Sequence, residues 1–135
     1  MKNDSIQTLS KNISIKPIIV PHRDEFSETV GYIIKGELKS ALFLPDIDKW
    51  EKWDKKIEDF IRNVDYAFID GTFYNGNEIQ HRNMDEIPHP FVVETIKKLK
   101  NLKKKHKKKV YFIHLNHTNP LHKPNDIITL SLIHI

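Results

Sequence analysis

The amino-acid sequence predicts a mixed fold, α/β or α+β, in which helices cover a β-sheet. Its first third holds three short apolar runs that are separated by turn residues. Two later segments carry apolar residues at helical spacing, and each is followed by another short apolar run. The 135 residues, 39% hydrophobic and 30% charged, fit one globular domain or a piece of a larger one.

The first three apolar runs predict a β-meander. The predicted strands cover residues 13–20, 28–35 and 40–44. The tetrapeptide GELK separates the second strand from the third as a turn, and Pro45-Asp46 ends the third strand.

The periodicity then changes from that of strands to that of a helix. Apolar residues recur at helical spacing at five positions: Trp50, Trp53, Ile57, Phe60 and Ile61. Asp48, with Glu51 three residues later, predicts a capping box at the start of this helix.

A strand at 66–69 follows, and it ends at Asp70-Gly71. The long loop at 72–88 is of the length that often carries function. A second helix is predicted to begin near His89-Pro90, because proline suits the first helical turn, and the last predicted strand covers 110–113.

The composition excludes several classes of protein. There are no cysteines, which excludes disulfides and thiolate metal sites. No apolar run approaches the roughly 20 residues that a membrane helix needs, and the first residues contain no apolar signal segment. We therefore expect no membrane contact.

Positive charge is concentrated in Lys97–Lys109, KKLKNLKKKHKKK. This run holds nine lysines and no acidic residue, and removing those nine charges from the formal net charge of +4 leaves −5. Nucleic-acid sites usually mix arginine and aromatic residues with lysine. The run is therefore expected to be a solvated helix end and turn, and nucleic acid is not the expected partner.

Four polar side chains follow predicted strands directly or after one or two residues: His22, Asp46, Asp70 and His114. Ligands collect at the carboxyl ends of strands in sheets with helical crossovers. Imidazole and carboxylate groups together suit zinc, iron or manganese. The residues alone leave two interpretations open, a metal site or ordinary turn and cap residues.

Five segments, taken in order, resemble a known family: PHRDEFSETVGYIIKG, LFLPDIDKWEKW, VDYAFIDGTFY, EIPHPFVVETIKKL and YFIHLNHTNPL. They resemble the C-terminal half of a metallo-β-lactamase-fold subgroup, pyrroloquinoline quinone biosynthesis protein B and its relatives. The resemblance covers about residues 13–124. It implies the α+β class, as the C-terminal half of an αββα sandwich, and a metal-dependent hydrolase. The resemblance also implies a cytoplasmic protein with a small-molecule substrate.

The resemblance also implies roles for individual residues. Asp46 and His114 are expected to bind a divalent metal, zinc in the first place, with iron and manganese as alternatives. His89 of IPHPF resembles a proton donor, while His22 and Asp70 are expected to line the site rather than bind the metal. Three residues resemble the loop after the last ligand and are expected to orient His114 from outside the metal shell: Asn116, His117 and Asn119.

The superfamily's H-x-H-x-D-H run, which supplies most metal ligands, does not occur in this sequence. The sequence therefore predicts at most two of the expected ligands. We expect residues 1–129 to be the C-terminal portion of a larger domain, inactive alone, whose N-terminal metal-binding half is absent. Residues 130–135, LSLIHI, match a translated sequencing adapter and are expected to be a non-native tail. Two other functions stay open: a non-catalytic cofactor carrier or binding protein, and a ribonuclease Z-like nucleic-acid hydrolase.

Overall fold

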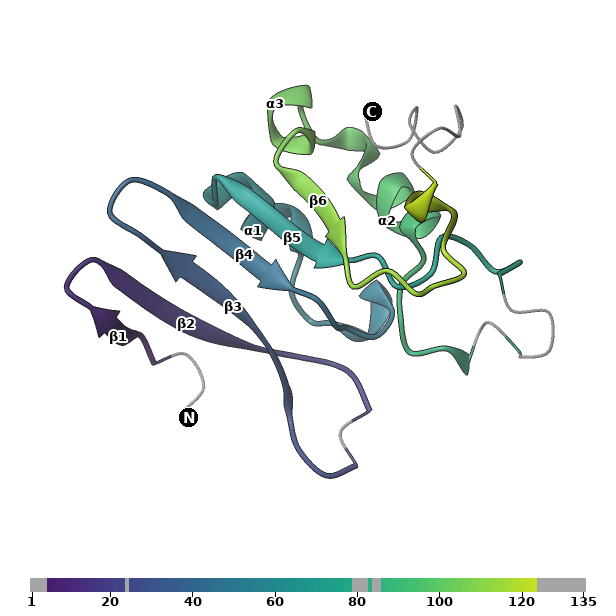
Figure 1. Cartoon of the computed structure of the whole chain (residues 1–135), viewed down its shortest axis with the longest axis horizontal. Coiled ribbons are helices and arrows are strands. Elements are labelled where there is room, and N and C mark those ends of the chain that lie inside the picture. The colour runs from purple at the N-terminus through teal and green to yellow at the C-terminus, as the bar shows by residue number, and fades with distance from the viewer. Residues whose placement is uncertain (1–4, 24, 79–82, 84–85, 124–135) are drawn as a thin grey trace.

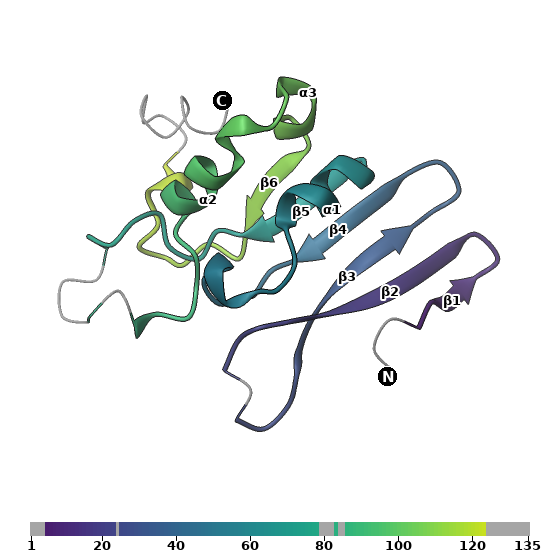
Figure 2. The same ribbon diagram turned by 180° about the vertical axis from the view of Figure 1, so that it is seen from behind.

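The computed structural model describes residues 5–23, 25–78, 83 and 86–123. It contains one six-stranded sheet with the strand order β1-β2-β3-β4-β5-β6. The helices gather on one face of this sheet (Figures 1 and 2), and none of those described is long and apolar enough to cross a membrane. This mixed sheet with few helices confirms the α+β class. The predicted tail at 130–135 lies outside the described residues.

The antiparallel part of the sheet agrees with the predicted meander. It consists of β2 (Ile13–Val20), β3 (Thr29–Lys35) and β4 (Ser40–Leu44). The sequence did not predict β1 (Gln7–Ser10), which pairs only with the start of β2. Pro17 lies beyond that pairing, at an edge of the sheet where a missing backbone N–H is tolerated.

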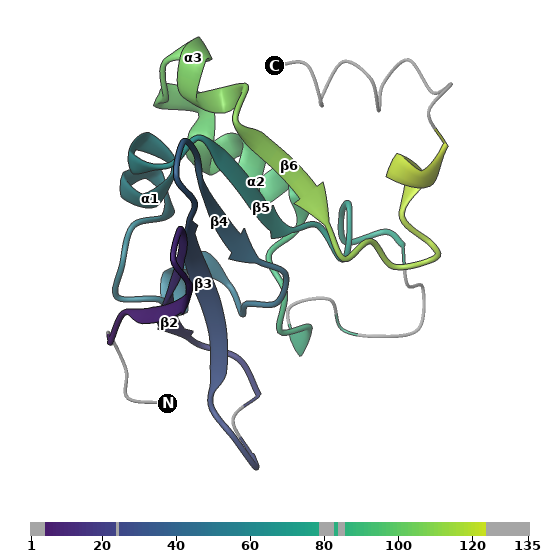
Figure 3. The ribbon, with the colours of Figure 1, turned by 60° about the vertical axis from the view of Figure 1, so that its left-hand side comes forward.

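The parallel part of the sheet adds β5 (Tyr66–Asp70) and β6 (Val110–Ile113) beside β4. Helices occupy the two crossovers, η1 (Trp50–Lys52) and α1 (Ile57–Asn63) before β5, and α2 (Val92–Lys98), η3 (Leu99–Asn101) and α3 (Lys104–Lys107) before β6. Because β2 and β4 both run antiparallel to β3, β2, β4, β5 and β6 all end at the same edge of the sheet. Figure 3 shows the loops after β5 and β6 leaving from that edge.

The first predicted helix is not continuous, which corrects the sequence prediction. Trp53 has an extended backbone, with φ −95° and ψ 128°, between η1 and α1. The Trp50 indole Nε1 donates to Thr95 Oγ1 at 2.9 Å, whereas the Trp53 Nε1 donates to Ile19 O at 3.2 Å. The two indoles are thus bonded to different parts of the chain, and these tertiary contacts override the local helical pattern.

The second helix begins at Val92, slightly later than predicted, because Glu94 Oε2 accepts the backbone N–H of Phe91 at 2.8 Å and caps the helix there. Phe91 also belongs to a small buried cluster with Phe73 and Ile87. The main core lies between the helices and the sheet and includes fully buried residues of both: Leu42, Leu44, Ile57, Ile61, Ala67 and Ile69.

The other face of the sheet is apolar, and none of the described helices covers it (Figures 1 and 2). Phe43, Tyr66 and Tyr111 alternate with core residues along their strands, and they are 38%, 40% and 47% exposed. The rings of Phe68 and Tyr111 lie 5.5 Å apart, and those of Tyr66 and Tyr111 lie 6.4 Å apart. Such a face is what one half of a two-sheet sandwich presents to the other half.

We predict that the chain expressed alone self-associates through this face. Large exposed apolar patches drive association because burying them removes apolar area from water. Replacing Phe43, Tyr66 and Tyr111 by lysine should give a monomer that binds less of a hydrophobic dye and unfolds more cooperatively. Light scattering after size exclusion and thermal unfolding measure both properties.

The matched control places three lysines at exposed polar positions instead, Ser10, Asn77 and Asn101. It adds the same charge without removing apolar surface, so it should still associate. A monomeric unchanged chain with a sharp thermal transition would refute this prediction. The variant with lysine in place of Phe43, Tyr66 and Tyr111 is hereafter called the soluble variant. It is also the parent protein in which the site substitutions below are made.

Candidate metal centre

The sheet brings five titratable side chains to one edge. His22 follows β2, Asp46 follows β4, Asp70 ends β5 and His114 follows β6. The loop before α2 adds His89. These are all five of the ligand, proton-donor and lining residues that the sequence predicted, and their side chains form two interlocking groups.

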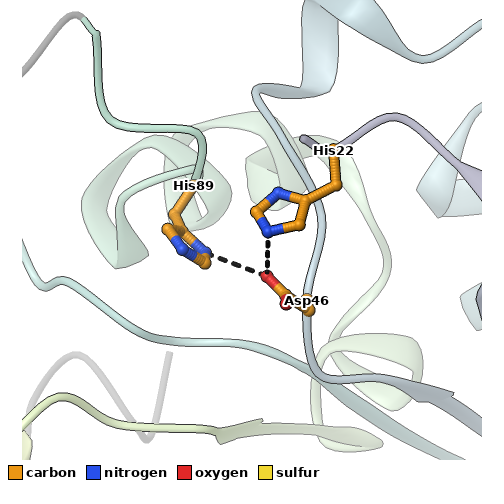
Figure 4. A group of neighbouring side chains, drawn as sticks. All are labelled: His22, Asp46 and His89. Atoms are coloured by element: carbon orange, nitrogen blue, oxygen red, sulfur yellow. Dashed lines mark ion pairs between the residues drawn. The ribbon is translucent and has the colours of Figure 1, made fainter. Parts of the chain in front are cut away.

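Asp46 lies between two imidazoles (Figure 4). Its Oδ1 is 3.1 Å from His22 Nε2 and 3.4 Å from His89 Nδ1. Yet this buried oxygen has no partner in hydrogen-bond geometry among the described residues, and the same is true of His22 Nδ1. At these distances each imidazole forms an ion pair with the carboxylate when it is protonated (Figure 4), and a bound cation would satisfy the same oxygen when both imidazoles are neutral.

Two sets of three potential ligands share Asp46. One consists of His22, Asp46 and His89, and the other of Asp46, Asp70 and His114; the ligand atoms within each set lie within 4.8 Å of one another. The geometry thus brings together more donors than the two that the sequence predicted. Nitrogen and carboxylate donors in sets of three fit a divalent cation such as zinc, iron or manganese.

Asp70 is fully buried, and both of its carboxylate oxygens are occupied. Oδ1 accepts hydrogen bonds from the Thr72 backbone N at 2.9 Å and from Thr72 Oγ1 at 2.7 Å. Oδ2 accepts from the Ile47 backbone N at 3.2 Å and lies 2.8 Å from His89 Nδ1. Its surroundings therefore suit a residue that orients its neighbours more than one that binds a metal directly.

His114 follows β6 in a strained backbone conformation, with φ 62°. Non-glycine residues rarely adopt this left-handed conformation, although histidine tolerates it better than most, and it often marks functional positions. The exposed His114 side chain places Nδ1 3.1 Å from Thr72 Oγ1. A backbone bond from Gly71 N to Ile113 O, 2.9 Å long, fixes the position where β6 ends.

Asn119 is 2% exposed and ties the loop after β6 to the DGTF loop. Its Nδ2 donates to Gly71 O at 2.6 Å and Thr72 O at 3.2 Å. The backbone N of Asn116 also donates to Thr72 O, at 2.9 Å. Both asparagines therefore hold the backbone beside His114 rather than its imidazole.

His117 was predicted to support His114 as well. Its side chain is exposed, and no hydrogen bond or ring contact of it occurs within residues 5–23, 25–78 and 86–123. That role stays a prediction. Thr72, in contrast, was given no role from the sequence, although it contacts three site residues; a hydroxyl two residues after a buried strand-end aspartate is the local signal that could have indicated it.

Residues 1–115 match the family described as the beta-lactamase superfamily domain, so the chain belongs to this superfamily. No curated protein matches the chain. Among solved structures it is similar to Zn²⁺-bound PqqB from Methylobacterium extorquens, with a TM-score of 0.75 and 17% sequence identity over 98% of this chain. The chain spans only 46% of that protein's length. The prediction of a partial metallo-β-lactamase domain is thereby confirmed.

We predict that Gly71 cannot carry a side chain without disturbing the site. An added Cβ would lie 2.8 Å from Phe112 Cβ and 3.0 Å from Leu115 Cδ2. Gly71→Ala in the soluble variant should therefore lower the free energy of unfolding by about 1–3 kcal/mol, measured by urea denaturation. Gly36→Ala, whose Cβ would meet only Lys39 O at 3.4 Å, is the control and should cost clearly less. Equal effects would contradict the expected clash.

Proposed function

We propose that this chain forms part of the active site of a metal-dependent hydrolase that is similar to PqqB. One observation carries the proposal: Asp46 Oδ1 is buried, without a hydrogen bond from the described residues, and faces His22 Nε2 at 3.1 Å. A carboxylate in that state is stable when it contacts a cation. The membership of the β-lactamase superfamily supports the same reading.

Asp46 and His114 remain the ligands that we propose first, and the geometry adds His22 to them. Since Asp46 belongs to both candidate groups, it is the residue that would serve both groups if each held a cation. Zinc is the metal we favour, because the similar PqqB is described as Zn²⁺-bound. Iron and manganese suit the same donors.

A divalent cation held here would supply Lewis acidity and lower the pKa of water that it binds. The chain's own part is to hold and move a proton. His89 Nδ1 lies 2.8 Å from the buried Asp70 Oδ2, and this bond fixes the orientation of the ring and the nitrogen that carries its proton. His89 is therefore proposed as the general acid: its Nδ1–H stays on Asp70, and the proton that passes to the leaving group is carried by Nε2.

A non-catalytic binding protein on the same fold is the alternative that metal binding alone does not exclude. The sequence lacks the H-x-H-x-D-H run. If the protein is an enzyme, the metal ligands that this run supplies in the superfamily must come from another part of the protein. Genomic sequencing upstream of the codon for Met1 separates the two. An in-frame H-x-H-x-D-H run supports the hydrolase, whereas an in-frame stop codon directly before residue 1 contradicts it.

We predict that Asp46→Asn and His114→Ala each weaken binding of Zn²⁺ or Co²⁺ to the soluble variant. Loss of a direct ligand should exceed the roughly 10–100-fold loss that follows removal of an outer-shell partner. His22→Ala should weaken binding comparably if His22 is a ligand. Isothermal titration and the absorption spectrum of bound Co²⁺ measure affinity and ligand type.

Two controls remove the same chemical groups outside the site. Asp54→Asn removes an exposed carboxylate, and His106→Ala removes an imidazole from α3, which precedes β6 and so lies at the opposite end of that strand from His114. Neither should change the metal affinity. The metal-binding proposal is wrong if the site variants and these controls bind the metal equally well.

A further inference from the structure

Thr72, the third residue of the DGTF segment, holds a hydroxyl at the centre of the site. Its Oγ1 lies 2.7 Å from Asp70 Oδ1, 3.1 Å from His114 Nδ1 and 3.3 Å from His89 Nδ1. The residue itself is only 9% exposed. One hydroxyl thus contacts a buried carboxylate and both of the imidazoles to which we assign metal binding and proton transfer.

The direction of these hydrogen bonds follows from what each group can donate. A hydroxyl has one proton, and an ionised carboxylate can only accept. The short 2.7 Å contact therefore has Thr72 Oγ1 donating to Asp70. The hydroxyl oxygen then has lone pairs left to accept a hydrogen bond from an imidazole N–H.

His114 is the imidazole that donates a hydrogen bond to the hydroxyl oxygen of Thr72. His89 Nδ1 is closer to Asp70 Oδ2, at 2.8 Å, than to Thr72 Oγ1, at 3.3 Å, so its N–H is used on the carboxylate. His114 Nδ1, at 3.1 Å, is the better donor to the hydroxyl. The result is a relay that runs from His114 Nδ1–H to Thr72 and from the Thr72 hydroxyl to Asp70.

We propose that Thr72 is the positioning residue that holds His114 as its Nδ1–H tautomer. A neutral imidazole carries one proton, so a proton on Nδ1 leaves the lone pair of Nε2 for a metal. Asp70 then determines which ring nitrogen carries the proton in two histidines, in His89 directly and in His114 through Thr72. This inference rests on the proposed metal-binding function, but the tautomer can be tested without any metal.

The backbone of Thr72 is fixed on both sides, which makes its hydroxyl a rigid reference. Its N–H donates to Asp70 Oδ1 at 2.9 Å. Its carbonyl oxygen accepts from Asn116 N at 2.9 Å and from Asn119 Nδ2 at 3.2 Å. The two asparagines predicted to support His114 thus act on it through Thr72.

The first measurement is the tautomer of His114, read from two-dimensional ¹H–¹⁵N spectra of histidine-labelled protein without metal. The spectra are recorded at about pH 8, where model imidazoles are neutral. We expect Nδ1 to be protonated in the soluble variant and in Thr72→Ser, which keeps the hydroxyl. Thr72→Val, of nearly the same shape, should shift His114 toward a mixture with the Nε2–H tautomer.

Thr8→Val is the matched control. It removes an exposed threonine hydroxyl from β1, the strand that lies farthest from β6 in the strand order of the sheet. Its His114 spectrum should equal that of the parent. An Nε2–H tautomer in the parent, or a Thr72→Val spectrum equal to that of Thr8→Val, overturns the proposal. If Thr72→Val does not fold, the spectra of the parent and of Thr72→Ser still decide.

The second measurement is zinc affinity by isothermal titration. Thr72→Val should bind Zn²⁺ about 10–100-fold more weakly than the parent, as for other partners that orient a metal ligand, and Thr72→Ser should recover most of that loss. Unchanged affinity in Thr72→Val counts against the proposal. An Nδ1–H His114 in a parent that binds no zinc would support the relay and refute the metal-binding function, so the two failures are distinguishable.

Discussion

The geometry of the site depends on the hydrogen bonds that the buried carboxylate of Asp70 accepts. Removing a carboxylate from water is costly unless hydrogen bonds replace its hydration. Here the replacements come from three separate segments: the Ile47 N–H after β4, the Thr72 N–H and hydroxyl after β5, and His89 before α2. Each segment must lie at hydrogen-bond distance from Asp70 to make its bond. The need to hydrogen-bond the buried carboxylate therefore also positions the site residues on these segments.

The same sheet that gathers the site residues leaves one of its faces uncovered by the described chain. The exposed aromatic residues of that face come from β4, β5 and β6, the strands whose ends carry Asp46, Asp70 and His114. A second sheet packed on this face would remove apolar area from water and would also approach the edge where the candidate ligands lie. Covering this face and completing the proposed metal site would therefore have the same structural requirement.

The sequence predicted most strands closely and the helices less well. Strands at 13–20, 40–44 and 110–113 agree with β2, β4 and β6 residue for residue, because short apolar runs bounded by turn residues are local signals. The break at Trp53 depends on its bond to Ile19, 34 residues earlier in the chain, and β1 depends on pairing with β2. Neither partner can be read from the local pattern.

The site shows the same limit. Positions after strand ends predicted which residues would meet, since parallel strands end at one edge of the sheet. The pattern did not predict that Asp70 would have both oxygens occupied, or that Thr72 would join it to His114. These contacts depend on how side chains from three loops are oriented. The same residues at the same sequence positions would be compatible with several different orientations.

The lysine run shows why the net charge of +4 says little about this site. Lys109 Nζ donates to the backbone oxygens of Ile61 and Val64 at 3.3 and 2.6 Å, where α1 ends, and so has a structural use. The run precedes β6, whereas His114 follows it, and five extended residues at about 3.3 Å each separate Lys109 from His114 by roughly 16 Å. That is about twice the Debye length of about 8 Å at physiological ionic strength. A charge at the start of β6, such as that of Lys109, is therefore largely screened from the site, which contains the carboxylates of Asp46 and Asp70.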